Sequence, residues 1–115
     1  MLEGKFKRYY INGKLSFEGE YKNGNLLYGK IYDVNGKIYE IKNGNGIVKE
    51  YHDNGKIKFE GEYLNGKKTG KVKEYDYNWT LEFEGEYLNG EKNGKGIQYF
   101  RGKLDFEGEY LNGKK

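Results

Sequence analysis

The sequence predicts an all-β fold, a single elongated antiparallel meander of tandem β-hairpin repeats. One stretch, Phe-Glu-Gly-Glu-Tyr-Leu-Asn-Gly, occurs unchanged at 59–66, 83–90 and 106–113, and 17–24 differs from it only by Lys for Leu. Within each copy, apolar and acidic side chains alternate with the period of two that is typical of a strand. Helical periodicity is absent, and the 19 glycines would destabilise any helix.

The repeated strand has two chemically different faces. Phe59, Gly61 and Tyr63 point to one face, and Glu60 and Glu62 point to the other. The central glycine leaves room for a neighbouring aromatic ring to lie across the backbone. Asn-Gly ends the strand, because both residues tolerate the positive φ of a tight turn.

Taken in order, the chain reads as one array over 1–115, without a linker between domains. Each unit is expected to hold a strand, a loop of about six residues, a second strand and a tight turn. The first strand of the third segment is short and lacks the central glycine. The boundaries are a half unit at 1–16, units at 17–38, 39–58, 59–82 and 83–105, and a half unit at 106–115.

The second strands carry lysines that alternate with small or apolar residues. Lys71, Lys73 and Lys95 are placed to share a face with the glutamates of the neighbouring strands. Cross-strand Glu–Lys pairs would cover this face, each contributing a few tenths of a kcal/mol to about 1 kcal/mol. Tyr75 and Tyr99 follow on the same face and form an aromatic row beside the lysines.

Composition excludes several classes of function. Seventeen per cent of the residues are aromatic, which favours an ordered chain despite a mean hydropathy of -1.09. The net charge of +3 comes from 21 basic and 18 acidic residues that are well mixed, so we expect no nucleic-acid binding. There is no transmembrane segment, no signal peptide and no cysteine, and cytoplasmic localisation is the default expectation.

Catalytic residues are not evident, and we expect no enzyme, no metal site and no cofactor. His52 is the only histidine and stands beside a turn, where a solvated side chain is expected. Pairs of glutamates recur at equivalent positions of the repeat, as a surface pattern does. An active site is normally singular, with its two carboxylates in different environments.

The stretch 83–96, Phe-Glu-Gly-Glu-Tyr-Leu-Asn-Gly-Glu-Lys-Asn-Gly-Lys-Gly, resembles a MORN repeat (membrane occupation and recognition nexus). It is also similar to the bacterial, antitoxin-like variants of that repeat. The resemblance spans nearly the whole chain and implies hairpins in one elongated, twisted sheet, with roles as scaffold, protein-interaction module or binder of acidic phospholipids. The unit at 39–58, Val72 and the turn at Asn78-Trp79 depart from the pattern, which affects the curvature expected there.

Two functions follow as expectations. The first is a non-enzymatic repeat scaffold that binds a protein or peptide along an aromatic-lined face: Phe17, Tyr21, Phe59, Tyr63, Phe83, Tyr87, Phe106 and Tyr110. The alternative is a peripheral module for acidic phospholipids, in contact through Lys71, Lys73, Lys95, Tyr75 and Tyr99. Carbohydrate binding ranks third, because tryptophan is not repeated.

Two further expectations concern Trp79 and the ends of the array. Trp79 replaces a turn glycine and is interpreted as a residue that covers an apolar end of the sheet, with ligand contact as the alternative. The terminal strands each have one edge without a partner in the sequence, which predicts self-association of copies. The competing explanation is that the chain is a segment of a longer array.

Overall fold

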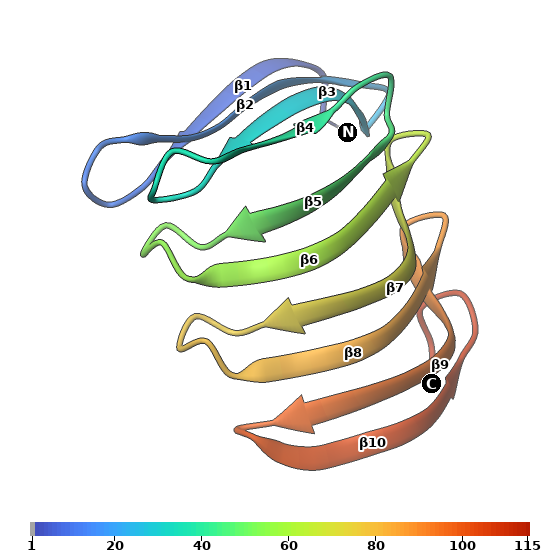
Figure 1. Cartoon of the computed structure of the whole chain (residues 1–115). Helices are drawn as coiled ribbons and strands as arrows, with labels where there is room; N and C mark the ends of the chain where they lie inside the picture. The colour runs from blue at the N-terminus through green and yellow to red at the C-terminus, as the bar shows by residue number, and fades with distance from the viewer. Residues whose placement is uncertain (1) are drawn as a thin grey trace.

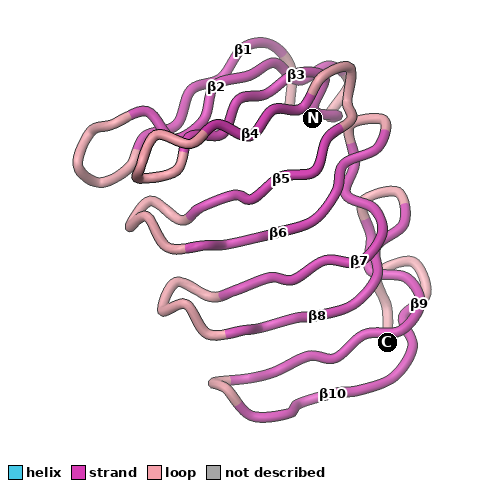
Figure 2. The backbone as a smooth tube through the Cα atoms, in the orientation of Figure 1, coloured by secondary structure: helices cyan, strands magenta, loops and turns pink. Residues whose placement is uncertain are grey.

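The computed structural model describes residues 2–115, and these form antiparallel strands joined in sequence order, without a helix (Figures 1 and 2). The all-β class and the tandem hairpins are thereby confirmed. The strands are β1 (Gly4–Tyr9), β2 (Leu15–Lys22), β3 (Asn25–Tyr32), β4 (Ile38–Ile41), β5 (Gly46–Tyr51), β6 (Ile57–Leu64), β7 (Lys67–Tyr75), β8 (Leu81–Leu88), β9 (Glu91–Phe100) and β10 (Lys103–Tyr110).

The strands form two sheets where the sequence predicted a single one. β1 to β4 make a four-stranded sheet and β5 to β10 a six-stranded sheet. β4 has four residues where β2, β6, β8 and β10 have eight, so it offers few partners for a ladder with β5. A single bridge, Lys42 to Asn45, joins the two strands beside their connecting turn, and they diverge from there in Figure 1.

The strands are joined by two kinds of connection, which lie on opposite edges of the molecule (Figure 2). After β6, Asn65 and Gly66 form a two-residue turn with φ of 53° and 80°. Two successive positive φ values match the twist of a hairpin, so the predicted six-residue loop is wrong. The connection that was predicted to be a tight turn is instead the longer one. For example, residues 52–56 separate β5 from β6.

Neighbouring repeats are also joined by backbone hydrogen bonds at the Asn-Gly edge. The N–H of Gly90 donates to the carbonyl of Lys68 at 2.9 Å, and the N–H of Gly113 donates to the carbonyl of Lys92 at 2.8 Å. Each turn is thereby fixed to the start of the preceding long strand. These bonds use main-chain atoms, so they place little restriction on side-chain identity.

The central glycines carry the aromatic rings, as predicted. A Cβ atom on Gly61 would lie 2.8 Å from Phe59 Cζ, and one on Gly85 would lie 2.7 Å from Phe83 Cζ. The rings of Phe59 and Tyr63 meet edge to face, with centroids 6.1 Å apart. Residues four apart on a straight strand are about 13 Å apart. The rings therefore lean over the glycine, on a strand that is curved in Figure 1.

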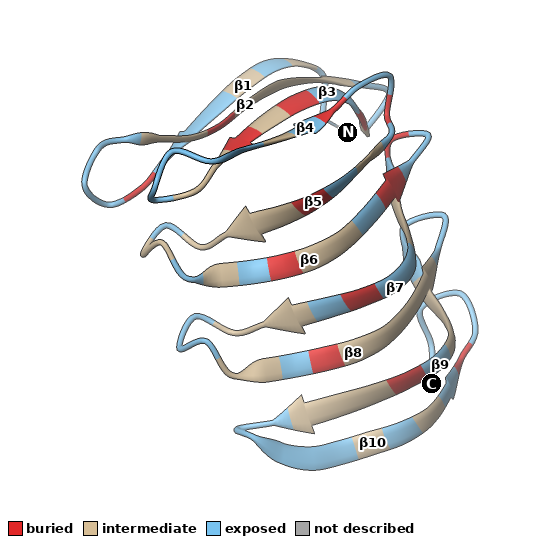
Figure 3. Cartoon of the chain, in the orientation of Figure 1, coloured by how far each residue is buried: buried red, intermediate tan, exposed pale blue. Residues whose placement is uncertain are grey.

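The core is a single cluster that runs across both sheets (Figure 3). Phe59 and Phe83 are 1% and 2% exposed, although each lies on a sheet that no helix covers. Lysine side chains supply part of the cover: the ammonium of Lys68 lies 4.3 Å from the Phe59 ring centroid, and that of Lys92 lies 4.4 Å from the Phe83 ring centroid. An ammonium group over a ring face is attracted by the negative face of the ring, so these lysines cover the rings with their charged ends.

Candidate functional site

The predicted aromatic face exists, but most of it is closed. The register places the six aromatic residues of β6, β8 and β10 on one face of the six-stranded sheet, and Phe17 and Tyr21 of the smaller sheet pack into the same core cluster. Burial is nearly complete for five of them, Phe17, Phe59, Tyr63, Phe83 and Tyr110. The other three, Tyr21, Tyr87 and Phe106, are half-buried. Most of the predicted partner-binding row is therefore core: the rings pack over the glycines, and lysine ammonium groups lie over four of them.

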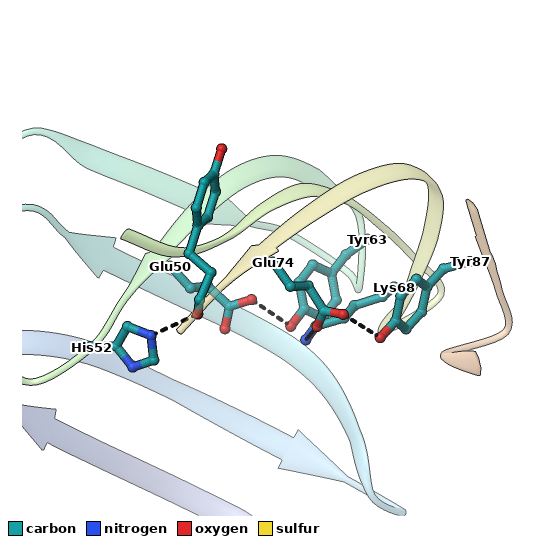
Figure 4. A network of polar contacts seen from close by, with 7 residues as sticks. Glu50, His52, Tyr63, Lys68, Glu74 and Tyr87 are labelled. Carbon is teal, nitrogen blue, oxygen red and sulfur yellow. Dashed lines mark hydrogen bonds and ion pairs between the residues drawn. The ribbon is translucent and has the colours of Figure 1, made fainter. Parts of the chain in front are cut away.

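Buried tyrosine hydroxyls on this face find partners on the adjacent strand (Figure 4). Tyr63 donates to Glu50 at 3.0 Å, and Tyr87 donates to Glu74 at 2.9 Å. Lys68 pairs with Glu74 at 3.9 Å. Burial, together with the nearby carboxylates, raises the pKa values of Tyr63 and Tyr87 above the ordinary tyrosine value. These contacts satisfy polar groups in the core and present no free nucleophile.

His52 serves the connection between repeats. Its Nε2 atom lies 2.9 Å from the backbone carbonyl oxygen of Tyr75 (Figure 4), and its ring meets the Tyr77 ring edge to face at 5.5 Å. The side chain is half-buried, so the expected solvated histidine is wrong. Among residues 2–115, no cluster of His, Asp or Glu has the arrangement that a metal ion requires.

The opposite face carries the predicted Glu–Lys pairing. Lys49, Glu60, Lys73 and Glu84 are direct cross-strand neighbours on β5 to β8, so the sign of charge alternates along the row. Lys73 and Glu84 also form an ion pair at 3.9 Å, with both side chains 45% exposed. Such exposed pairs contribute little to stability.

A groove of about 670 Å³ crosses this face from β5 to β9. Its floor is formed at Val48, Gly61, Val72, Gly85 and Gly96. Val48 and Val72 are buried, with side chains in the core cluster, so the groove meets mainly their backbone. The Cβ positions of the three glycines also point toward the aromatic rings of the other face, so the floor of the groove is main chain along its length.

The ends of the groove are apolar, and its walls are charged. Ile47 and Ile97 lie toward opposite ends, and Tyr39 of the smaller sheet closes the side nearest β5. Sequence reasoning missed these three residues. Ile97 could have been found from the sequence. It is the cross-strand neighbour of Glu84 on one side, and the neighbour on the other side is Lys73, so the pattern predicts lysine at position 97.

The predicted lipid-contact residues divide into two groups. Lys71, Lys73 and Lys95 line the groove, with glutamates between them. Tyr75 and Tyr99 are not among the lining residues, and the Tyr75 hydroxyl donates to Glu60 at 3.1 Å. The lysines therefore form part of a mixed surface. Among residues 2–115 there is no helix of the length and apolarity that crossing a bilayer would require.

Trp79 does not cover the sheet. Its side chain is 63% exposed at the tip of the loop between β7 and β8, which contradicts the covering interpretation. The Lys56 ammonium of the preceding loop lies 6.0 Å from the indole centroid. Its φ is 67°, a left-handed conformation.

Comparison with protein families identifies the repeat. A family model described as a MORN repeat variant matches residues 2–23 and 44–65, the segments that contain the hairpins β1–β2 and β5–β6. No curated protein matches the chain. MORN repeats are generally modules for interaction with proteins or membrane lipids and are non-enzymatic. The two matched hairpins, and the same strand order in the hairpins that follow them, support a MORN repeat protein.

Proposed function

We propose that this chain is a non-enzymatic scaffold that binds a protein or peptide in the groove on its Glu/Lys face. The observation that carries the proposal is the groove itself, which crosses five strands, while the aromatic row is largely buried. Binding sites for ligands are usually concave and apolar, with a few placed polar groups.

The charge pattern of the groove favours a polypeptide as its partner. Lysine and glutamate alternate between strands that lie about 4.8 Å apart, so a partner meets both signs of charge within a short distance. Ile47, Ile97 and Tyr39 offer apolar contacts at the ends. A polypeptide can present apolar, acidic and basic side chains at fixed spacing, and complementary charges set its orientation and register.

Charge reversal tests the proposal. A variant with Lys71→Glu, Lys73→Glu and Lys95→Glu changes three groove residues, and a matched control reverses Lys22, Lys42 and Lys67 beside the Asn-Gly turns. Proteins captured from an extract of the source cells by the unaltered chain should be lost by the first variant and kept by the control. Equal capture by both variants, with unchanged circular dichroism, would place the binding surface elsewhere.

Binding to acidic phospholipids is the second candidate. It is supported by the exposed position of Lys71, Lys73 and Lys95, and weakened by the glutamates between them, since membrane attraction requires clustered basic residues. Co-sedimentation with phosphatidylcholine vesicles, with and without phosphatidylserine, tests it. Binding should require the anionic lipid, should weaken in moderate salt and should be lost on reversal of the three lysines.

We also propose self-association through the terminal strands. Among residues 2–115, β1 and β10 lie at the outer edges of the two sheets. Lys5 and Lys7 of β1 and Glu107 and Glu109 of β10 could form the same cross-strand pairs as Lys71 and Glu86 do within the array. Sedimentation velocity over a wide concentration range tests this, and mass should fall for Glu107→Lys with Glu109→Lys. A strict monomer at every concentration would contradict it.

A further inference from the structure

Two adjacent loops are locked together at the edge opposite the Asn-Gly turns. They comprise residues 52–56 and 76–80 (Figure 1). The Tyr77 hydroxyl donates to Asp53 at 2.8 Å, and Asn54 Nδ2 donates to the Tyr77 carbonyl at 2.9 Å. The His52 ring packs against Tyr77, as described above. Side chains on these loops are therefore held in place before any partner arrives, which lowers the entropy lost on binding.

Trp79 takes a position that the other loops of this kind give to glycine. The same backbone hydrogen bond, from this residue to the carbonyl three residues earlier, is made by Gly13, Gly36, Gly55 and Trp79. The three glycines have φ between +85° and +87°, and Trp79 has φ of 67°. Glycine adopts this conformation freely, whereas a bulky side chain is strained in it.

The strain at Trp79 is not compensated by burial. Trp79 and Tyr77 are 63% and 48% exposed, although each is large enough to cover much apolar surface. Strained residues that persist without a packing role tend to lie at functional sites. Trp and Tyr are also enriched among the residues that dominate binding energy at protein interfaces.

We propose that Lys56, Tyr77 and Trp79, named here the aromatic platform, bind an acidic polypeptide segment through one of its apolar side chains. The apolar side chain packs on the indole, and a neighbouring carboxylate pairs with Lys56. This site lies outside the groove, since none of its three residues lines it, and so extends the proposed function to a second surface.

Lys56 is the group of the platform that can pair with an acidic partner, because it forms no ion pair with any residue of 2–115. The carboxylates of Asp76 and Asp53 keep their negative charge but are engaged within the loops: Asp76 accepts the N–H groups of Asn78 and Thr80, each at 2.9 Å, and Asp53 accepts the Tyr77 hydroxyl. A cationic ligand would compete with Lys56 for the indole, whereas an anionic one gains from it.

A polypeptide fits these charges better than an anionic bilayer does. Stable attraction to a bilayer needs a cluster of several basic residues next to the apolar ones. The platform contains one lysine, and the next loop adds Arg101, whose guanidinium lies 5.3 Å from the Phe100 ring centroid. One or two cations suffice to pair with a carboxylate placed at a fixed distance from an apolar side chain.

Trp79 is the only tryptophan, so its fluorescence reports directly on this site. The full chain is used to select binders from a phage-displayed library of random dodecapeptides. We expect the enriched peptides to combine an apolar side chain with adjacent Asp or Glu, and to shift the emission of the chain to shorter wavelength when added as synthetic peptides. Trp79→Gly and Lys56→Glu should weaken their binding about tenfold or more.

Leu88→Ala is the matched control, because Leu88 is an exposed apolar residue beside an Asn-Gly turn on the opposite edge, 52% exposed. It should leave peptide binding unchanged, and Trp79→Gly should melt no lower than the unaltered chain, since glycine relieves the strained φ. Peptides without acidic residues, equal binding to Trp79→Gly, or a melting temperature lowered by several degrees would each overturn the proposal. An emission shift with phosphatidylserine vesicles but with none of the peptides would overturn it in favour of a membrane.

Discussion

The two faces of the six-stranded sheet have the same backbone and the same strand spacing, yet they differ in almost every physical property. On one face, Phe59 and Phe83 are nearly inaccessible because glycines receive their rings and lysine ammonium groups lie over them. On the other face, charged side chains stay exposed around a groove. Aromatic content alone therefore does not identify a binding face, because in a thin sheet the aromatic residues have to form the core.

The largest expected effect comes from the aromatic face. Phe83→Ala should lower the free energy of unfolding by about 3–5 kcal/mol, because it opens a cavity where a ring is 2% exposed. Urea denaturation measures this loss. Glu84→Ala, one residue away on the other face, is the control and should cost less than about 1 kcal/mol. Similar losses for both variants would remove the distinction between the faces.

A change at the floor of the groove should have the next largest effect. A Cβ atom on Gly85 would lie 2.7 Å from Phe83 Cζ and 2.7 Å from the Lys95 carbonyl oxygen. Gly85→Ala should therefore cost about 1–3 kcal/mol through overpacking, as measured by thermal unfolding. Gly90→Ala is the comparison variant. Gly90 lies at a turn with positive φ, and the atom nearest to an added Cβ would be 3.6 Å away, so this variant measures the cost of positive φ without a clash.

Alkaline pH should destabilise the aromatic face specifically. Burial and Glu50 raise the pKa of Tyr63, and burial and Glu74 raise that of Tyr87, above the ordinary value of 10.0. A raised pKa means that the folded state holds its proton more tightly, so this stabilisation is complete below pH 10 and is lost as the pH rises above it.

At pH 11 the loss should be about 1 kcal/mol for each such tyrosine. Chemical denaturation between pH 9 and pH 11 measures the slope. Tyr63→Phe removes one titrating group and should reduce the slope, even though it lowers stability at neutral pH. An unchanged slope in that variant would show that other groups, such as lysines, account for the alkaline effect.

The smallest expected effect concerns the charged face. A double-mutant cycle on Lys73→Ala and Glu84→Ala should give a coupling energy of about 0.2–1 kcal/mol, since both side chains are 45% exposed. The coupling should fall in high salt. A value above 2 kcal/mol would mean that this face contributes to stability as the aromatic face does.

Alternation in the sequence was enough to predict strands, faces and the role of the central glycine. It identified Phe59, Gly61 and Tyr63 as neighbours on one face, because side-chain direction in a strand is a local property. It also predicted that the lysines and glutamates share a face, and the register of the structure joins Glu60 to Lys73 there, because a slip by one residue would exchange the faces.

Accessibility and connection geometry could not be predicted in the same way. Phe59 is covered in part by the Lys68 ammonium from the next strand, and the break between β4 and β5 depends on a ladder that fails to form. Both are tertiary properties. The tight turn and the longer loop were predicted in each other's place, because Asn-Gly occurs in both kinds of connection. Trp79 is exposed because it lies at the tip of one of the longer loops.

The main-chain hydrogen bonds at the Asn-Gly edge have a consequence for how such a protein changes length. Because Gly90 and Gly113 are joined to the preceding repeat through backbone atoms, a junction between hairpins needs no dedicated pair of side chains. Duplication or deletion of a whole hairpin then leaves an equivalent junction behind. Each added hairpin would lengthen the sheet by about 10 Å, at two strand spacings per hairpin. Evolution could thus adjust the length of the sheet in discrete steps, while point mutations adjust its charged face independently.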